Sequence, residues 1–263
     1  MPLEGVGKID RISIPSEEIE KNTFYLGLEN IEKESGKIIE YQSINKEKIK
    51  SNTFRFTEDH ILYGKLRPYL NKVCLPDRIG VCSTDIIPIF PNNNIIDRRY
   101  LYYLLRTTRF IKWATMRSTG ANLPRISPRV LKKYPVSFPP LDIQEKIASI
   151  LEKAESAINK RQESIRLADE FLKSTFLEMF GDPIANPKGF PTFKVCKICD
   201  TTSGGTPDRS RSEFYGGNIP WIKSGELKNS FVTSCGETIT EAGFNNSSMK
   251  KLPINSILIA MYG

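Results

Sequence analysis

The chain has 263 residues, and its 38 Lys and Arg residues exceed its 30 Asp and Glu residues, which gives a formal net charge of +8 at pH 7. This length fits one large domain or two modest ones, and a hydrophobic fraction of 39% is enough for a packed core. No apolar run approaches the roughly 18 residues that cross a bilayer, and the N-terminus has no apolar signal segment. These features exclude an integral membrane protein and a disordered tail, and they predict a cytoplasmic location.

The five cysteines do not indicate a disulfide framework. Their number is odd, and without a signal segment reduced thiols are expected. Cys196 and Cys199 form a C-x-x-C pair, but the sequence has no second such pair, and His60 is the only histidine. Structural zinc needs four ligands, so we expect no metal. The apolar residues 193–199 predict a strand instead.

Positive charge is concentrated in one part of the chain. Residues 98–133 contain ten Lys and Arg residues and no acidic residue. Surface helices normally mix both signs to limit repulsion, so this run indicates a polyanionic partner. Arginine dominates the run, and its planar guanidinium suits phosphate oxygens and guanine edges. We therefore favour nucleic acid over a membrane surface as the partner.

The elements around this basic run are predicted in chain order. Residues 61–63 predict a strand, residues 97–116 one helix capped by Asp97, and residues 134–138 a short strand. A polar loop with Asn122 and Arg125 follows the predicted helix.

Residues 141–180 predict a long helix. Asp142 and Glu145 match a capping box at its start, and no proline or glycine occurs before Gly181. Forty residues at 1.5 Å each give roughly 60 Å of helix. A heptad repeat predicts a coiled-coil face that packs against a partner helix. Its positions are Ile147, Leu151, Ala154, Ile158, Arg161, Ile165, Ala168, Leu172 and Met179.

The two flanks of this helix resemble each other. Residues 6–10, 25–29 and 56–64 parallel residues 195–200, 221–226 and 252–260 in the same order. The shared order predicts a duplicated domain whose second copy stops early.

Three sets of motifs point to one family. The first is Ser203-Gly-Gly-Thr-Pro-Asp followed by Tyr215-Gly-Gly-Asn-Ile-Pro-Trp-Ile; the second is Ile126-Ser-Pro-Arg-Val-Leu with Phe138-Pro-Pro-Leu-Asp-Ile-Gln-Glu-Lys-Ile; the third is Ala168-Asp-Glu-Phe-Leu-Lys with Phe176-Leu-Glu-Met-Phe-Gly-Asp-Pro. Together they resemble the specificity subunit of Type I restriction-modification systems. The first set resembles the opening of a target recognition domain, the second its end, and the third the end of the spacer helix.

The resemblance implies an α+β fold in three parts. Residues 1–140 would form the first target recognition domain, with a twisted β-sheet. Residues 141–180 would form the long coiled-coil spacer helix. Residues 181–263 would form the beginning of a second, partial α+β recognition domain, so the chain is expected to be truncated within it.

The resemblance also implies a function and partners. The chain would be a non-catalytic subunit that reads half of a bipartite DNA site and docks modification (methyltransferase) subunits through its long helix. Restriction (endonuclease/translocase) subunits would complete the complex. S-adenosylmethionine would bind the methyltransferase, so no cofactor is expected here. Because the family's second spacer helix is missing, we expect that two copies of this chain can pair as a homodimer through the long helix.

Candidate DNA contacts combine cations for phosphates with side chains for base edges. Arginines suit guanine, and Asn122 suits adenine. The candidates in the first domain are Lys65, Arg67, Tyr69, Arg106, Arg109, Arg117, Asn122 and Arg125. Those in the second are Arg209, Arg211 and Lys223.

Two alternatives remain open from the residues alone. Asp208, Glu226 and Lys228 fit a loose PD…E-x-K pattern, which would make the chain a metal-dependent nuclease. A helical scaffold without nucleic-acid contact is the other alternative.

Overall fold

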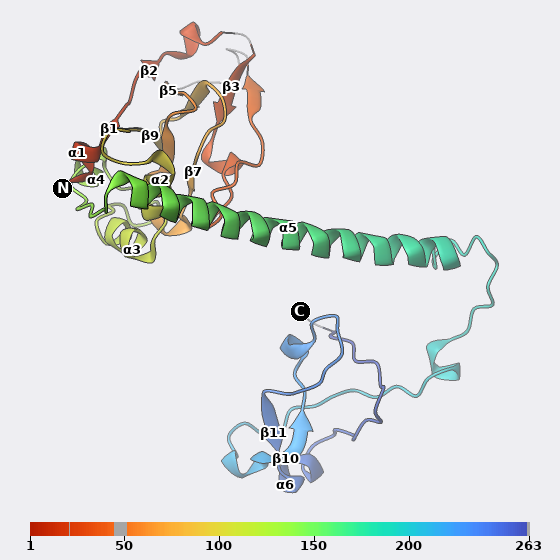
Figure 1. Cartoon of the computed structure of the whole chain (residues 1–263). Coiled ribbons are helices and arrows are strands. Elements are labelled where there is room, and N and C mark those ends of the chain that lie inside the picture. The colour runs from red at the N-terminus through yellow and green to blue at the C-terminus, as the bar shows by residue number, and fades with distance from the viewer. Residues whose placement is uncertain (21, 45–51, 262–263) are drawn as a thin grey trace. The chain divides into compact units, whose positions relative to one another are not determined.

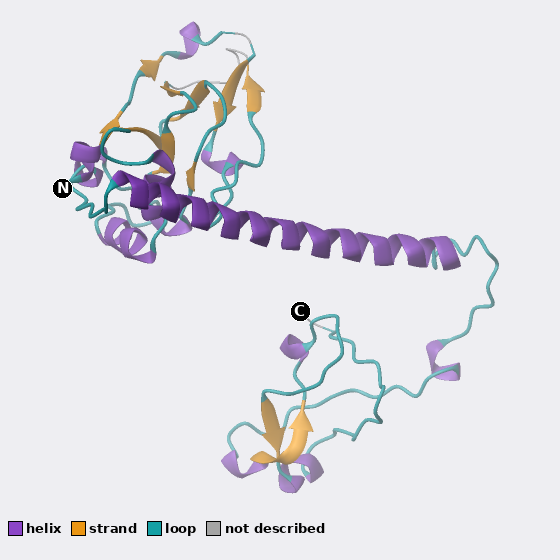
Figure 2. Ribbon diagram, in the orientation of Figure 1, coloured by secondary structure: helices purple, strands orange, loops and turns teal. Residues whose placement is uncertain are grey.

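The computed structural model describes residues 1–20, 22–44 and 52–261, and the chain divides into two units, Met1–Ser174 and Thr175–Gly263 (Figure 1). The first unit combines two β-sheets with short helices and with most of the long helix α5, Leu141–Phe180 (Figure 2). The expected α+β class is confirmed, with two sheets in the first unit where one was predicted. The three-part domain division stays a prediction, since the two units meet within α5.

A four-stranded antiparallel sheet forms the centre of the first unit. Its strands, in spatial order, are β1 (Gly7–Ile9), β9 (Ile86–Pro91), β6 (Ile61–Gly64) and β7 (Val73–Cys74). The predicted strand at 61–63 is thus confirmed as β6. All four β6 residues are buried, with Ile61 and Tyr63 in one core cluster and Leu62 in another. This alternation places β6 between two hydrophobic layers.

A five-stranded mixed sheet packs against the first one. Its strands, in spatial order, are β2 (Ser13–Ile14), β5 (Thr53–Phe56), β8 (Gly80–Ser83), β3 (Thr23–Leu26) and β4 (Gln42–Ile44). Strands β3 and β8 are parallel, and the other neighbours are antiparallel. Phe54 and Phe56 from this sheet share a buried cluster with Leu62 and Ile86 from the other. Their burial holds the two sheets together.

Short helices cover the opposite face of the four-stranded sheet. They are α1 (Leu3–Val6), α2 (Arg98–Leu104), α3 (Thr108–Met116) and α4 (Pro128–Leu131). The predicted cap is confirmed, because the Asp97 carboxylate accepts a hydrogen bond from the Tyr100 amide at 2.8 Å. The single helix predicted over 97–116 is wrong. The Thr107 hydroxyl caps a second helix by accepting from the Phe110 amide, so the chain starts afresh at that point.

Two predicted strands do not form. Residues 134–138 make only an isolated bridge between Pro2 and Pro135, and Pro135 has no N–H to continue a ladder. Residues 193–199 are all exposed and contain a 3₁₀ turn, Val195–Lys197. The apolar residues of this segment pack on no core that would favour an extended conformation.

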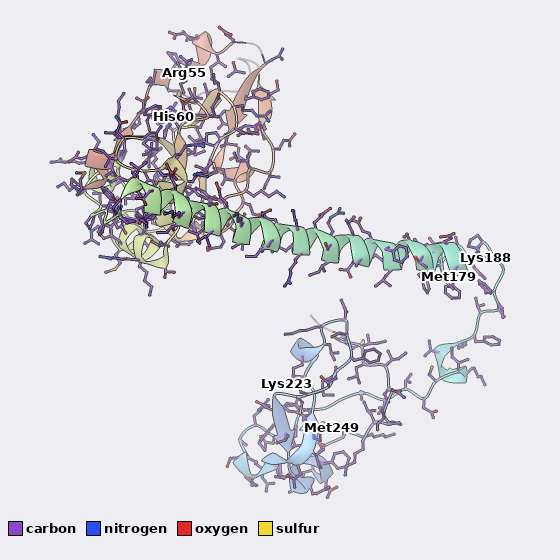
Figure 3. The ribbon with its side chains drawn as sticks, in the orientation of Figure 1. Arg55, His60, Met179, Lys188, Lys223 and Met249 are labelled. Carbon is purple, nitrogen blue, oxygen red and sulfur yellow. The ribbon has the colours of Figure 1, made fainter. Side chains whose placement is uncertain are left out.

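Helix α5 is confirmed over its full predicted length. It begins at Leu141, one residue before Asp142, so Asp142 lies in the first turn and does not cap the helix as predicted. At the other end, the Lys188 ammonium donates to the carbonyls of Glu178 and Met179, both at 2.7 Å (Figure 3). These contacts satisfy two carbonyl groups that the helix itself leaves without partners. Within the described residues, no helix is both long enough and apolar enough to span a membrane.

Helix α5 uses one face to pack against the rest of the first unit. Gln144 and Ala148 are buried, and Glu152 and Glu155 pair with arginines of the α2 region. The heptad positions follow a different line along the helix. Ile147 is half-buried, and the other heptad positions are exposed. Ile158, Ile165 and Leu172 are 57%, 64% and 67% exposed. The docking face and the apolar stripe are therefore separate faces.

The second unit is built around a hairpin of β10 (Tyr215–Trp221) and β11 (Glu237–Ile239), with α6 (Glu241–Asn245) following it. Its buried side chains include Phe214, Trp221 and Ile239. The 3₁₀ helices within the described residues are η1 (Ser16–Glu18), η2 (Leu28–Asn30), η4 (Pro68–Leu70), η5 (Val195–Lys197), η6 (Ser212–Phe214) and η7 (Ser224–Glu226).

One part of the internal repeat has a structural counterpart. In η2 the Asn30 side chain accepts from the Gly27 amide at 3.0 Å, and in η7 the Glu226 side chain accepts from the Lys223 amide at 2.8 Å. Both turns follow a strand at the aligned positions. The third aligned segment differs, because residues 252–260 form no strand while their counterpart contains β6.

The anchor of α5 gives a first prediction. Gln144 is fully buried; its side chain accepts from the Asp97 amide at 2.9 Å and donates to the carbonyls of Ile95 and Pro139 at 3.1 and 2.8 Å. Gln144→Ala would leave these groups unpaired, so we expect the free energy of unfolding to fall by about 2–4 kcal/mol in chemical denaturation. Gln162→Ala, on the exposed part of the same helix, is the control. Equal stability of the two variants would contradict the anchoring role.

Candidate nucleic-acid interface

Two basic loops of the first unit are joined by backbone hydrogen bonds. The Arg67 amide donates to the Pro124 carbonyl at 2.7 Å, and the Ile126 amide donates to the Lys65 carbonyl at 3.0 Å. Residues 65–71 and 117–126 thus form one surface, which brings together six of the predicted contacts. These are Lys65, Arg67, Tyr69, Arg117, Asn122 and Arg125.

Backbone conformation fixes the shape of both loops. Arg67 and Asn71 flank η4 in left-handed conformations, with φ of 49° and 51°. In the other loop, Gly120 has φ of 107°, and a Cβ there would lie 2.9 Å from the Leu123 carbonyl oxygen. Thr119 and Arg125 exchange two backbone hydrogen bonds, at 3.0 and 2.8 Å, across this turn. The exposed residues 121–123 are therefore held at the tip of a closed loop.

A carboxylate lies between the cations of the two loops. The Asp85 side chain accepts from Arg125 Nε at 3.1 Å and from Nη2 at 3.4 Å, and Lys65 Nζ lies 3.5 Å away. Burial disfavours the charged carboxylate, but the hydrogen bond and charge of Arg125, with Lys65, outweigh it and hold the pKa of Asp85 below its ordinary value. Asp85 is thus ionised at neutral pH and relieves the repulsion between Lys65 and Arg125.

Helix α3 adds further cations beside η4, against which it packs. Arg109 and Lys112 are exposed on this helix. The Arg117 guanidinium lies over the Trp113 ring, 4.8 Å from its centroid, and Trp113 packs against Phe110 and Tyr134. Among the described residues, Arg109, Lys112 and Arg117 form no ion pair with a carboxylate, so their charges face solvent unpaired.

Arg106 faces inward, away from the cations that reach solvent. Its side chain is 14% exposed. Nη1 donates to Glu155 at 2.9 Å and also to the Tyr102 hydroxyl, and Nη2 donates to the Glu34 carbonyl at 3.0 Å. Its guanidinium thus joins α5 to the first unit. That arrangement favours a bracing role over the predicted DNA contact, which stays untested.

The candidate cations of the second unit are paired with nearby acids. Arg209 and Lys223 both contact Glu237, at 2.9 and 3.5 Å, and Arg211 contacts Glu213 at 2.7 Å. Arg209 also lies over the rings of Tyr215 and Trp221. These pairs lower the free positive charge of this surface, and the predicted DNA contacts here stay predictions.

The glycine-rich motif of the second unit has a structural explanation. Gly216 has φ of 78°, and a Cβ on Gly217 would lie 2.5 Å from the Ile239 carbonyl oxygen. The Trp221 indole donates to the Gly205 carbonyl at 3.1 Å, and the Tyr215 hydroxyl donates to the Pro207 carbonyl at 2.6 Å. The motif thus pins the segment around residues 203–208 onto the hairpin.

Two of the three predicted nuclease residues, Asp208 and Glu226, serve as loop contacts. Asp208 accepts from the amide and hydroxyl of Ser210, which is a local turn. Glu226 accepts from the amides of Lys223 and Gly236, at 2.8 and 2.5 Å. Within the described residues, no group of three His, Cys, Asp or Glu side chains could hold a metal ion. Nothing in this geometry favours the nuclease alternative.

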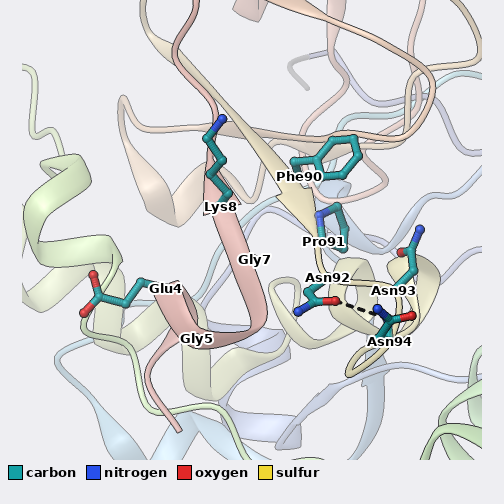
Figure 4. Close-up of a pocket in the computed structure, with 9 residues that line it drawn as sticks. All are labelled: Glu4, Gly5, Gly7, Lys8, Phe90, Pro91, Asn92, Asn93 and Asn94. Carbon is teal, nitrogen blue, oxygen red and sulfur yellow. Dashed lines mark hydrogen bonds between the residues drawn. The ribbon is translucent and has the colours of Figure 1, made fainter.

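A shallow pocket lies elsewhere on the first unit. Its volume is about 440 Å³, and Figure 4 shows its lining by Glu4, Lys8, Phe90 and the asparagines 92–94. The Asn94 amide donates to the Asn92 side chain at 3.2 Å, so part of this polar lining is already satisfied. None of the predicted DNA contacts lines this pocket.

Sequence reasoning missed two residues of the interface. Lys112 lay within the acid-free run, and its helical spacing from Arg109 would have indicated a shared face. Asp85 is separated from Arg125 by 40 residues, and its contacts depend on the tertiary fold. The only sequence signal was that acidic residues are rare between residues 61 and 140, and Asp85 is one of them.

Comparison with known proteins identifies the family. The chain belongs to the family described as "Type I restriction modification DNA specificity domain", whose sequence pattern is matched by residues 1–167. The expected family is thus confirmed.

The chain is similar to several curated specificity subunits. It is 36% identical over 131 residues to the Type I restriction enzyme EcoDI specificity subunit of Escherichia coli, a match that covers 50% of this chain and 29% of that protein. It is 24% identical over 192 residues to the MjaIX specificity subunit of Methanocaldococcus jannaschii, covering 66% and 44%. The matches therefore span less than half the length of these relatives.

Solved structures show the same fold. The HsdS subunit from Thermoanaerobacter tengcongensis superposes with a TM-score of 0.52 at 20% identity, over 91% of this chain and 63% of that one. A chain from a structure of the assembly of a type I R-M system gives a TM-score of 0.54 at 21% identity, over 87% and 62%.

The position of Arg106 gives a second prediction. Arg106→Ala would leave Glu155 without its cation and the Glu34 carbonyl without its donor, so thermal and chemical denaturation should show a loss of about 2 kcal/mol in unfolding free energy. Lys153→Ala, an exposed cation on α5, should change it by less than about 0.5 kcal/mol. A stable Arg106→Ala variant that fails to bind duplex DNA would reverse this assignment.

Proposed function

We propose that this chain recognises double-stranded DNA as a non-catalytic specificity subunit of a Type I restriction-modification complex. The observation that carries the proposal is the pair of joined loops, 65–71 and 117–126, which present cations, an amide and a tyrosine on one surface. Membership of a family of DNA specificity domains supports DNA as the polyanion. The acid-free composition of residues 98–133 supports the same conclusion.

The interface divides into two kinds of contact. Arg109, Lys112 and Arg117 reach solvent without a carboxylate partner among the residues that the structure describes, as expected of phosphate contacts that hold the duplex. Asn122 lies exposed at the tip of a closed loop, where its amide suits an adenine edge. The phosphate contacts would supply affinity, and the loop tips would supply sequence preference.

Helix α5 is the proposed assembly element. Its docking face binds the first unit, and its apolar stripe lacks cover within the described residues. A coiled-coil stripe of this length requires another helix. We propose that a second copy of this chain supplies it in a homodimer, and that α5 also docks modification subunits, which bind S-adenosylmethionine. Restriction subunits would join through that complex.

The phosphate contacts yield a third prediction. Lys112→Ala combined with Arg117→Ala should weaken binding to any duplex and should reduce the slope of log K against log salt by about 1–2, because each phosphate contact contributes roughly 0.9. Fluorescence anisotropy over a salt series measures both quantities. The control with equal charge loss is Lys153→Ala combined with Lys173→Ala on α5. An equal salt slope in the two double variants would remove Lys112 and Arg117 from the interface.

The apolar stripe yields a fourth prediction. Light scattering of the full chain should report about twice its 29.9 kDa mass. Ile158→Asp combined with Ile165→Asp places two charges in the seam and should give a monomer with an unchanged helical spectrum. Gln162 is exposed and lies on the same side of the helix as Gln144, away from the apolar stripe. Gln162→Asp should therefore leave the dimer intact. A monomeric wild type would disprove the homodimer and leave DNA recognition untouched.

A further inference from the structure

The guanidinium of Arg125 is held differently from the other exposed cations of the interface. It makes its ion pair through one edge only, with Nε and Nη2 donating to the two oxygens of Asp85 at 3.1 and 3.4 Å. Nη1 also donates to the Leu123 carbonyl at 3.4 Å. Nη1 and Nη2 each carry a second N–H. The end of the guanidinium therefore retains a pair of donors, on a side chain that is 42% exposed.

We propose that Arg125 reads a guanine in the major groove and that Asp85 is the positioning residue that aims it. The inference rests on the proposed function and names the residue that sets its base preference. Guanine presents two acceptors, N7 and O6, on its major-groove edge, and a guanidinium fork matches both. No other candidate contact in the described part of the first unit combines an outward fork with a carboxylate that fixes its direction.

The carboxylate also selects against a phosphate contact. Asp85 carries a negative charge close to the Arg125 guanidinium, and a phosphate approaching that guanidinium would meet this charge. A guanine edge carries no net charge, and the partial negative charges on N7 and O6 make this repulsion smaller than for a phosphate. In the described part of the chain, no carboxylate pairs with Arg117 or Lys112, so they are the better phosphate ligands. The two groups of cations are thus suited to different parts of the duplex.

The backbone around Arg125 supports a fixed aim. Its amide and carbonyl both bond to Thr119, and the residues on either side of it bond to the other loop, through Arg67 and Lys65. Lys65 Nζ lies 3.5 Å from Asp85 Oδ1, the oxygen that also accepts from Arg125 Nε, and helps to hold the carboxylate in place. The backbone and the side chain of Arg125 are therefore held before DNA arrives, which lowers the entropic cost of a specific contact.

Selection from a pool of random-sequence duplexes tests this inference with the full chain. The wild type should enrich duplexes with guanine at one position. Arg125→Lys keeps the charge but has no fork, so preference for that guanine should fall about 10-fold or more. Asp85→Asn keeps the shape and loses the anchoring charge, so preference should fall at the same position, to a smaller extent. Arg117→Ala is the matched control and should weaken all sequences alike.

Atomic substitution in the DNA gives the second readout. Replacing the selected guanine by 7-deazaguanine removes the N7 acceptor and should weaken binding by the wild type. The same replacement should cause little further loss in Arg125→Lys, because the base change and the substitution remove the same contact. Thermal melting of each variant separates a loss of folding from a loss of base recognition. Should Asp85→Asn unfold, the result for Arg125→Lys alone tests the inference.

The outcomes separate this inference from the function on which it rests. A wild type that binds no duplex overturns both. A wild type that selects a site which Arg125→Lys and Asp85→Asn select equally well overturns only the roles of Arg125 and Asp85. A lower salt slope in Arg125→Ala with an unchanged selected sequence would assign Arg125 to phosphate and overturn the inference as well.

Discussion

The interface depends on the link between two loops that are far apart in sequence. Backbone hydrogen bonds join residues 65–67 to residues 124–126, and the Asp85 carboxylate lies between Lys65 and Arg125. Without that carboxylate the two cations would repel each other at close range. A half-exposed pair contributes little to global stability, because solvent screens it. Its main effect is to fix the direction of the side chains that face the partner.

The basic run serves two separate purposes in the fold. Arg106 turns inward to pair with Glu155 of α5, and Arg99 pairs with Glu152 at the surface, so part of the charge holds the long helix to the rest of the first unit. Arg109, Lys112 and Arg117 remain on the surface. Acids supplied by α5 thus pair with two of the ten cations in residues 98–133. The recognition surface and the base of the spacer helix therefore share one structural element, the α2–α3 region.

The sequence predicted the features that depend on local patterns. Helix α5 was predictable because its forty residues contain no proline or glycine and carry a heptad repeat from Ile147 to Met179. The gathering of Lys65, Arg67 and Arg125 was predictable only as a set of basic loop residues. Their backbone pairing depends on the left-handed conformation of Arg67 and on the closed turn at Gly120. No local pattern specifies which loops will meet.

The errors have physical causes as well. The break between α2 and α3 was hidden because the apolar spacing continues through it, while Thr107 is a residue that helices tolerate and that also caps them. Arg106 was predicted to contact DNA because the sequence alone does not show whether an arginine in a basic helix faces solvent or a distant glutamate. Its partner, Glu155, lies in another helix and is separated from it by 49 residues.

Amide hydrogen exchange of the full chain, alone and with a pool of random duplexes, tests the central claim most directly. The account predicts that DNA slows exchange in residues 65–71 and 117–126, while the exposed part of α5 keeps its free-state rates. Protection confined to the second unit or to α5, with both loops unchanged, would contradict it.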